Sequence, residues 1–160
     1  MQRLNEQVGQ ALKDSQHVLV TAESCTGGGI STAITDVAGS SEWFDRAFIT
    51  YSNAAKQEML GVSKQTLDQF GAVSEETVKA MVQGALRHSN GTIAVSVSGV
   101  AGPGGGSKEK PVGTVWFAWG DNNDWNTTEK KQFIGDRTAV RIQAIDYALQ
   151  KIYLYLKELK

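Results

Sequence analysis

The stretch "HVLVTAESCTGGGISTAITDVAGSS", residues 17–41, decides the fold, because it joins a strand pattern to a helix pattern through an unusual turn. The β-branched run at 17–22 is typical of a buried strand, and apolar residues then recur at helical spacing as far as Val37. Between the two patterns stand three consecutive glycines, each of which costs roughly 0.8–1 kcal/mol relative to alanine inside a helix. We expect the helix to run from near Thr26 to near Gly39.

The glycines at 27–29 admit two interpretations. A helix that begins near Thr26 places Ser24 at the carboxyl edge of the sheet, where open α/β folds bind ligands. The missing side chains in its first turn would expose unpaired N–H groups and the positive end of the helix dipole to an anion or a developing oxyanion. Alternatively, the glycines let the helix pack closely on the sheet, and Ser24 or Thr26 only caps it. The sequence leaves both interpretations open.

Strand and helix patterns alternate along the rest of the chain. Asn53 and Ser74 are predicted helix N-caps, and Gly61 is a predicted helix end. Alternation with one late hairpin indicates an α/β layered fold with a mixed sheet, and the length predicts one domain over residues 1–160. The expected elements are a helix over about 4–12, a strand at 47–52, helices from Asn53, Ser63 and Ser74, strands at 92–98, 113–120 and 126–134, and a long helix from Asp136.

Composition narrows the classes of function. Hydrophobic residues make up 41% of the 160 residues, and 16 Lys and Arg against 17 Asp and Glu give a net charge of −1. No segment is basic enough to follow a phosphate backbone, so we expect no nucleic-acid partner. The lone cysteine excludes an internal disulfide, and the N-terminal residues lack the apolar core of a secretion signal. No apolar run approaches the roughly 18 residues of a membrane span. We therefore expect a soluble, cytoplasmic protein.

Lys56 stands at the third position of the helix expected after Asn53. The helix dipole disfavours a cation there, so the neutral amine is easier to reach. A lysine with a lowered pKa can take a proton from a serine hydroxyl, as a serine–lysine hydrolytic dyad requires. A solvated surface lysine is the alternative interpretation.

A second glycine-rich segment, residues 98–114, overlaps the end of the strand expected at 92–98. Successive N–H groups there can form a nest for phosphate, although the spacing fits neither the dinucleotide-binding fingerprint nor the P-loop. A loose mobile loop is the alternative interpretation.

No metal site is expected. His17 and His88 lie far apart in the sequence, and neither an H-E-x-x-H nor a C-x-x-C motif occurs. Cys25 is a second candidate nucleophile, because a helix N-terminus stabilises a thiolate. The sequence does not decide whether Cys25 or the adjacent Ser24 is the nucleophile.

Five blocks of sequence occur in order and span nearly the whole chain: "AESCTGG" (22–28), "YSNAAKQEMLGV" (51–62), "GAVSEETV" (71–78), "SGVAGPGGGSKEKPVGTVW" (98–116) and "GDR" (135–137). Together they resemble the C-terminal domain of the CinA competence/damage-inducible family. The resemblance implies a three-layer α/β/α sandwich with a mixed, mainly parallel five-stranded sheet. It also implies deamidation of nicotinamide mononucleotide to nicotinic acid mononucleotide and ammonia, without a cofactor. Longer members carry an additional N-terminal domain, and we expect this chain to be the stand-alone form.

The resemblance also implies the roles of individual residues. The serine nucleophile of the first block falls on Ser24, and the lysine base of the second falls on Lys56. We expect oxyanion donors near Thr26 and Gly27, a phosphate partner at Arg137 or in the loop at 102–107, and Glu23 orienting Lys56 or a water. The complete set expected around the substrate, apart from the dyad, is Glu23, Thr26, Gly27, Tyr51, Asn53, Gly102, Gly104, Gly106, Ser107 and Arg137.

Two further expectations concern assembly and competing functions. Family members tend to self-associate, so we expect a homodimer or a larger homo-oligomer that binds a small nucleotide. A non-catalytic nucleotide-binding module and a serine amidase for another amide are the alternative functions.

Overall fold

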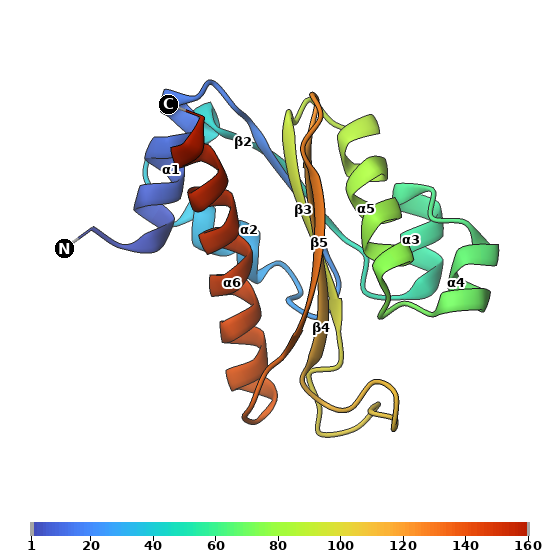
Figure 1. Cartoon of the computed structure of the whole chain (residues 1–160). Helices are drawn as coiled ribbons and strands as arrows, with labels where there is room; N and C mark the ends of the chain where they lie inside the picture. Colours follow the sequence, from blue (N-terminus) through green and yellow to red (C-terminus); the bar gives the residue numbers. More distant parts are fainter. Residues whose placement is uncertain (1, 160) are drawn as a thin grey trace.

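The computed structural model describes residues 2–159, in which six α-helices, one short 3-10 helix and five strands alternate (Figure 1). In chain order the elements are α1 (Leu4–Asp14), β1 (Leu19–Glu23), α2 (Gly29–Thr35), η1 (Ser40–Glu42), β2 (Phe44–Ile49), α3 (Asn53–Leu60), α4 (Lys64–Phe70), α5 (Glu75–Arg87), β3 (Ile93–Gly99), β4 (Thr114–Asp121), β5 (Asn126–Gln132) and α6 (Arg137–Glu158).

The five strands form one mixed sheet with the order β2-β1-β3-β4-β5. β1 pairs in parallel with β2 and with β3, whereas β4 is antiparallel to both of its neighbours. Four strands therefore run in one direction and β4 runs against them, as the expected mixed, mainly parallel sheet requires. The chain passes from β1 to one side of it for β2 and then to the other side for β3. The carboxyl end of β1 is thus the topological switch point, where α/β sheets form ligand crevices.

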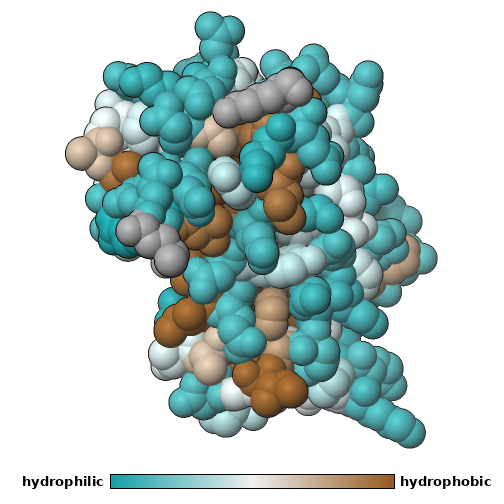
Figure 2. Space-filling view, turned by 60° about the vertical axis from the view of Figure 1, so that its left-hand side comes forward, coloured by the Kyte–Doolittle hydropathy of each residue, from teal (hydrophilic) through white to brown (hydrophobic). Residues whose placement is uncertain are grey.

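Helices cover both faces of the sheet, which gives the predicted α/β/α layers. Helices α1, α2 and α6 lie on one face, and α3, α4 and α5 lie on the other (Figure 1). Each face has its own cluster of buried apolar residues. Burial of this apolar area, at about 25 cal/mol per Å², is the main force that fixes the layers. On the face of α1 and α6, hydrophilic side chains cover most of the surface and apolar ones form separate patches (Figure 2).

Two predicted boundaries are wrong, and each has a local cause. The strand expected at 47–52 is β2, which ends at Ile49 because its partner β1 ends at Glu23, opposite it in register. The helix expected to begin near Thr26 begins at Gly29 and ends at Thr35. Gly27 and Gly28 have φ values of 58° and 100°, which a right-handed helix cannot contain. The other predicted elements are confirmed to within a few residues.

The long C-terminal helix carries the predicted apolar stripe. Leu149, Ile152 and Leu156 are buried in the core, whereas Ile142 is 54% exposed. The stripe therefore packs mainly inside the fold. Within residues 2–159, no helix has the length and apolarity needed to cross a membrane.

Candidate active site

Ser24 is the first residue after β1, at the carboxyl edge of the sheet. Its N–H donates to the carbonyl of Val97 on β3 at 3.0 Å, which continues the ladder between the two strands for one more residue. The side chain is nearly buried but borders a pocket, as an attacking group must. The sheet thus fixes the main chain that carries this hydroxyl.

Lys56 reaches the Ser24 hydroxyl from a different element, α3. It lies in the first turn of α3, whose N-cap is Ser52 and not the predicted Asn53, because the Ser52 hydroxyl accepts from Ala55 N at 3.0 Å. Lys56 Nζ lies 2.9 Å from Ser24 Oγ and also donates to the carbonyls of Thr50 and Tyr51, at 2.8 and 3.3 Å. The two carbonyls hold the amine beside the hydroxyl.

The environment of Lys56 favours its neutral form. The side chain is only 1% exposed, and none of its hydrogen-bond partners is a carboxylate. Burial therefore lowers the pKa of the Lys56 ammonium from 10.5 to about 8. About a tenth of such a lysine is neutral at pH 7, against well under a thousandth for an ordinary one. A neutral amine beside a hydroxyl can accept its proton, which is the arrangement of a serine–lysine pair.

Glu23 occupies the position where the sequence suggested a ligand. Its fully buried carboxylate accepts from the hydroxyls of Thr21 and Thr26, at 3.0 and 2.7 Å, and from the N–H groups of Ile30 and Ser31, at 2.9 and 3.0 Å. The anion at the N-terminus of α2 is therefore this chain's own side chain. Of the two expected roles of Glu23, the orientation of Lys56 is wrong in this structure, since these four donors satisfy its two oxygens and Lys56 is not among them; the orientation of a water stays a prediction.

The glycines at 27–29 allow backbone angles that other residues rarely adopt and a close approach of α6. Gly27 and Gly28 adopt positive φ, and a Cβ on Gly29 would stand 2.4 Å from Ile145 Cδ1 on α6. The close-packing interpretation is therefore confirmed only in part: Gly29 packs against α6 and not against the sheet, and the N-cap of α2 is Gly28 and not Ser24 or Thr26. The interpretation that the glycines expose the end of α2 to a ligand is wrong, because Glu23 already fills that position.

Cys25 lies beside Ser24 and borders the same pocket, but its environment is unsuited to a thiolate. The side chain is 6% exposed, and burial raises the pKa of the thiol to about 11. A neutral thiol is a weak nucleophile. The structure therefore favours Ser24 where the sequence did not separate the two.

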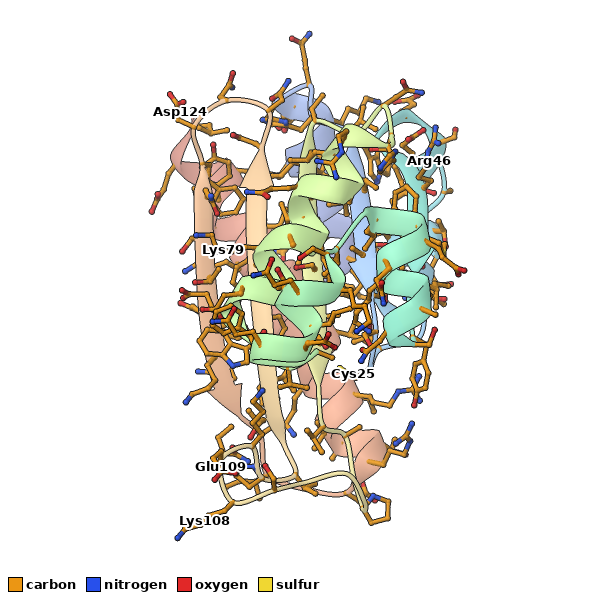
Figure 3. All side chains as sticks on the ribbon, turned by 90° about the vertical axis from the view of Figure 1, so that its right-hand side faces the viewer. Cys25, Arg46, Lys79, Lys108, Glu109 and Asp124 are labelled. Carbon is orange, nitrogen blue, oxygen red and sulfur yellow. The ribbon has the colours of Figure 1, made fainter. Side chains whose placement is uncertain are left out.

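A pocket of about 320 Å³ opens beside the Ser24–Lys56 pair. This volume falls at the lower end of the range of small-molecule sites. Cys25 lies nearer to the end of the molecule that carries Lys108 and Glu109 than to the end where Arg46 and Asp124 lie (Figure 3). The lining residues come from the ends of β1 and β3, from the loop after β3, from the segments before α3 and before α5, and from α3 and α6: Ser24, Cys25, Tyr51, Lys56, Ala72, Val73, Ser98, Gly99, Val100, Ala101, Gly102, Gly104, Gly105 and Arg137.

Arg137 joins three segments at the mouth of this pocket. Its Nη1 donates to the Gly102 carbonyl at 3.0 Å, and its Nη2 donates to the Tyr51 hydroxyl at 3.2 Å. Tyr51 is 62% exposed, so its ring lies at the rim. The predicted residues Tyr51, Gly102, Gly104 and Arg137 thus meet around one opening, although the sequence separates them widely.

Other predicted site residues lie elsewhere. Thr26 and Gly27 border a different pocket, between α2 and α6. The Gly27 N–H donates to the Ser24 carbonyl at 3.0 Å and is not free for an oxyanion, whereas the Thr26 N–H has no acceptor among residues 2–159. Asn53 is exposed at the start of α3 and does not line the Ser24 pocket.

Two predicted loop residues shape the loop and do not line the pocket. The Ser107 hydroxyl accepts from Lys110 N, and its N–H donates to the Lys110 carbonyl, both at 3.0 Å. A Cβ on Gly106 would stand 2.9 Å from Val112 N. Both positions therefore serve the turn of the loop.

Sequence reasoning missed Arg141, which holds the main chain beside Ser24. It follows Arg137 by four residues on α6, and that helical spacing was the available indication. Among residues 2–159, no group of three or more His, Cys, Asp or Glu side chains has the arrangement of a metal site.

The fold and the site define a three-layer α/β/α protein with a buried serine–lysine pair at the switch point of its sheet. A serine–lysine pair beside a pocket supplies the nucleophile and the base that acyl transfer requires. The family model for the CinA C-terminal domain matches residues 1–156, and the chain belongs to this family.

Relatives match over almost the whole chain. The nicotinamide-nucleotide amidohydrolase PncC of Enterobacter agglomerans is 57% identical over 150 residues, which are 94% of this chain and 92% of that protein. The protein of the same name from Escherichia coli K12 is 56% identical, over 96% of this chain and 93% of its own. A CinA superfamily protein of Klebsiella pneumoniae has a solved structure with a TM-score of 0.93 at 38% identity, covering 97% and 96% of the two chains.

Proposed function

We propose that this chain hydrolyses the carboxamide of nicotinamide mononucleotide, with Ser24 as nucleophile and Lys56 as general base. The class of reaction rests on the relatives named nicotinamide-nucleotide amidohydrolase, which share 56–57% identity with this chain over more than nine-tenths of both. At that identity the chain is an amidase of this kind. The observation that carries the mechanism is the 2.9 Å contact between Ser24 Oγ and the buried Lys56 Nζ.

The first half of the reaction forms an ester. Neutral Lys56 takes the proton of the Ser24 hydroxyl while Oγ attacks the carboxamide carbon. The Thr26 N–H donates to the oxyanion that develops, an interaction whose loss at one donor typically lowers the rate by about 10²–10³. The tetrahedral intermediate then breaks its C–N bond, Lys56 gives its proton to the nitrogen, and ammonia leaves. Ser24 now carries the nucleotide through an ester bond.

The second half of the reaction repeats these roles with water. Lys56 takes a proton from a water molecule as that water attacks the ester carbon. The C–O bond to Ser24 then breaks, and Lys56 returns the proton to Oγ. The product is nicotinic acid mononucleotide, and no step requires a metal or a cofactor.

The other end of the nucleotide needs a partner for its phosphate. Arg137 presents a guanidinium at the mouth of the pocket, and guanidinium groups bind phosphate through paired N–H donors. The loop beside it brings Gly102 and Gly104, whose N–H groups have no acceptor among residues 2–159. Tyr51, at the rim, offers a ring face and a hydroxyl to the ligand. These groups favour a nucleotide over free nicotinamide.

The test is ammonia release by the purified protein. We expect release from nicotinamide mononucleotide in the presence of a metal chelator, and at least tenfold lower kcat/KM with free nicotinamide. Ser24→Ala abolishes release, and Cys25→Ala, the matched control one residue on, retains it. No release at high enzyme concentration would favour a non-catalytic nucleotide-binding module. A preference for free nicotinamide would favour an amidase for another amide, and loss of activity in Cys25→Ala alone would overturn the assignment of the nucleophile.

A further inference from the structure

Arg141 holds two successive carbonyls of the turn that follows Ser24. Its Nε donates to the Cys25 carbonyl at 3.0 Å, and its Nη2 donates to the Thr26 carbonyl at 3.1 Å. Arg141 comes from α6, more than a hundred residues further along the chain. A half-buried cation from a distant helix therefore fixes the main chain next to the nucleophile.

Because the peptide bond is planar, a carbonyl held by Arg141 also fixes the direction of the N–H in the same peptide unit. In a trans peptide unit the N–H points opposite to the C=O. Because Arg141 holds the Cys25 carbonyl, the Thr26 N–H of the same unit is directed away from Arg141. Cys25 borders the Ser24 pocket, whereas Thr26 and Arg141 border the pocket between α2 and α6. An N–H directed away from Arg141 is also directed away from the pocket that Arg141 borders.

The next peptide unit is fixed in the same way. Arg141 holds the Thr26 carbonyl, and the Gly27 N–H on the other side of that unit donates to the Ser24 carbonyl at 3.0 Å. Of these two N–H groups, the one of Gly27 is used and the one of Thr26 has no acceptor among residues 2–159. Buried backbone N–H groups are nearly always paired in proteins. An unpaired one beside a nucleophile is available for an oxygen of the substrate.

The charge of Arg141 adds a second effect. A cation that accepts electron density from a carbonyl polarises the whole amide and strengthens its N–H as a donor. The polarised donor matters most when negative charge develops on the substrate oxygen, which happens only on the way to the tetrahedral intermediate.

We propose that Arg141 is a positioning residue: by holding the Cys25 carbonyl it aims the Thr26 N–H at the oxyanion of the tetrahedral intermediate. This inference rests on the proposed function, because it assigns a role in the chemistry of Ser24. Arg141 itself does not touch the substrate. Its action differs from that of Arg137, which is expected to bind the substrate directly.

The experiment compares Arg141→Ala and Arg141→Lys with the wild type and with Gln143→Ala. Gln143 is the matched control, because its Nε2 also donates from α6 to two main-chain carbonyls, those of Ile134 and Ala139, at 2.9 and 3.0 Å. For each protein, ammonia release from nicotinamide mononucleotide is measured over a range of substrate concentration and pH, and thermal unfolding is followed in parallel.

The expected result is a selective loss of kcat. In Arg141→Ala, kcat falls about 30- to 100-fold, somewhat less than for complete loss of one oxyanion donor, because the N–H is misdirected and not removed. KM stays within about twofold, since the interaction exists only in the transition state, and the pH midpoint set by Lys56 does not move. Arg141→Lys recovers part of kcat, because an ammonium can hold one carbonyl. Gln143→Ala behaves as the wild type.

Each other outcome contradicts the inference in a recognisable way. An unchanged kcat in an active Arg141→Ala protein overturns it, and so does a loss that appears mainly in KM or in the pH midpoint. If Arg141→Ala does not fold, Arg141→Lys decides by the same criteria. A wild type that releases no ammonia overturns the proposed function, and the inference with it, whereas an active wild type with an unaffected variant overturns the inference alone.

Discussion

The two glycine-rich segments of this protein follow parallel strands at the same edge of one sheet, yet they are built in opposite ways. The turn after β1 is buried at residues 23–26, and its carboxylate, hydroxyls and carbonyls are held by hydrogen bonds from β1, α2 and α6. The loop after β3 is exposed throughout residues 103–109 and is fastened at a few points.

The contrast separates two tasks of one site. Transition-state stabilisation depends on donors that are already in place when charge develops, so the nucleophile belongs on the fixed turn. A nucleotide has to enter and leave, so its phosphate end is met by the exposed loop and by Arg137. The same residue type, glycine, permits positive φ in the turn and leaves main-chain N–H groups accessible in the loop.

The largest effect is expected at Lys56, the base that acts on Ser24 in the fixed turn. Lys56→Met should lower kcat about 10⁴-fold, because no other group of residues 2–159 within hydrogen-bond reach of the Ser24 hydroxyl can accept its proton. Lys64→Met is the control, since Lys64 loses the same charge on the surface of α4, where its side chain is 77% exposed. Steady-state ammonia release measures both. Retention of a tenth of the activity in Lys56→Met would remove Lys56 from the mechanism.

The next effect concerns the stability of the turn. Glu23→Gln keeps the shape of the side chain but turns an amide NH₂ toward groups that are themselves donors, so the free energy of unfolding should fall by about 3 kcal/mol. Glu42→Gln, at a side chain 59% exposed, should change it by less than about 0.5 kcal/mol. Urea unfolding of both variants gives the comparison. Equal stabilities would mean that the turn is no more constrained than the surface.

The pH dependence of the reaction follows from the pKa of Lys56. The base works in its neutral form, and its pKa is lowered to about 8 by burial. Because neutral amine is lost as pH falls through that value, kcat/KM should be about tenfold below its plateau at pH 7 and should level off above about pH 9. A profile that still rises beyond pH 10 would indicate an ordinary, solvated lysine. A plateau already reached at pH 6 would contradict a pKa near 8 for the base.

The smallest effect is expected at the exposed loop. Lys110 Nζ donates to the Phe70 carbonyl at the end of α4, at 2.8 Å, and so ties the loop to the segment that leads into Ala72 and Val73 of the pocket lining. Lys110→Ala should raise KM about fivefold and leave kcat within twofold, as expected for one charge-assisted hydrogen bond of about 1 kcal/mol. Lys108→Ala removes the same charge from the same exposed loop. Equal changes in the two variants would show that charge, and not attachment, is what matters.

Much of the fold could be predicted because periodicity reports burial. The alternation of strand and helix patterns gave the layers, and the Ser74 cap was correct because the Ser74 hydroxyl does accept from Thr77 N at 3.2 Å. Boundaries near the site were less accurate. The end of β2 depends on where its partner strand ends, and the start of α2 depends on two positive φ values, which no local pattern contains.

The site residues could likewise be predicted only where the sequence itself carries the signal. Ser24 and Lys56 could be predicted as a pair from the resemblance, and their contact is present in the structure. The role of Glu23 could not, because four groups from three segments converge on its carboxylate only after folding. Arg141 was missed for the same reason, since its partners are main-chain carbonyls that any residue could supply.

The most direct measurement is a crystal structure of the protein with nicotinic acid mononucleotide bound. The account predicts that the carboxyl carbon lies about 3–3.5 Å from Ser24 Oγ, with one carboxyl oxygen accepting from the Thr26 N–H and the phosphate beside Arg137. A nucleotide whose carboxyl group points away from Ser24 and Lys56, with the phosphate in their place, would contradict it.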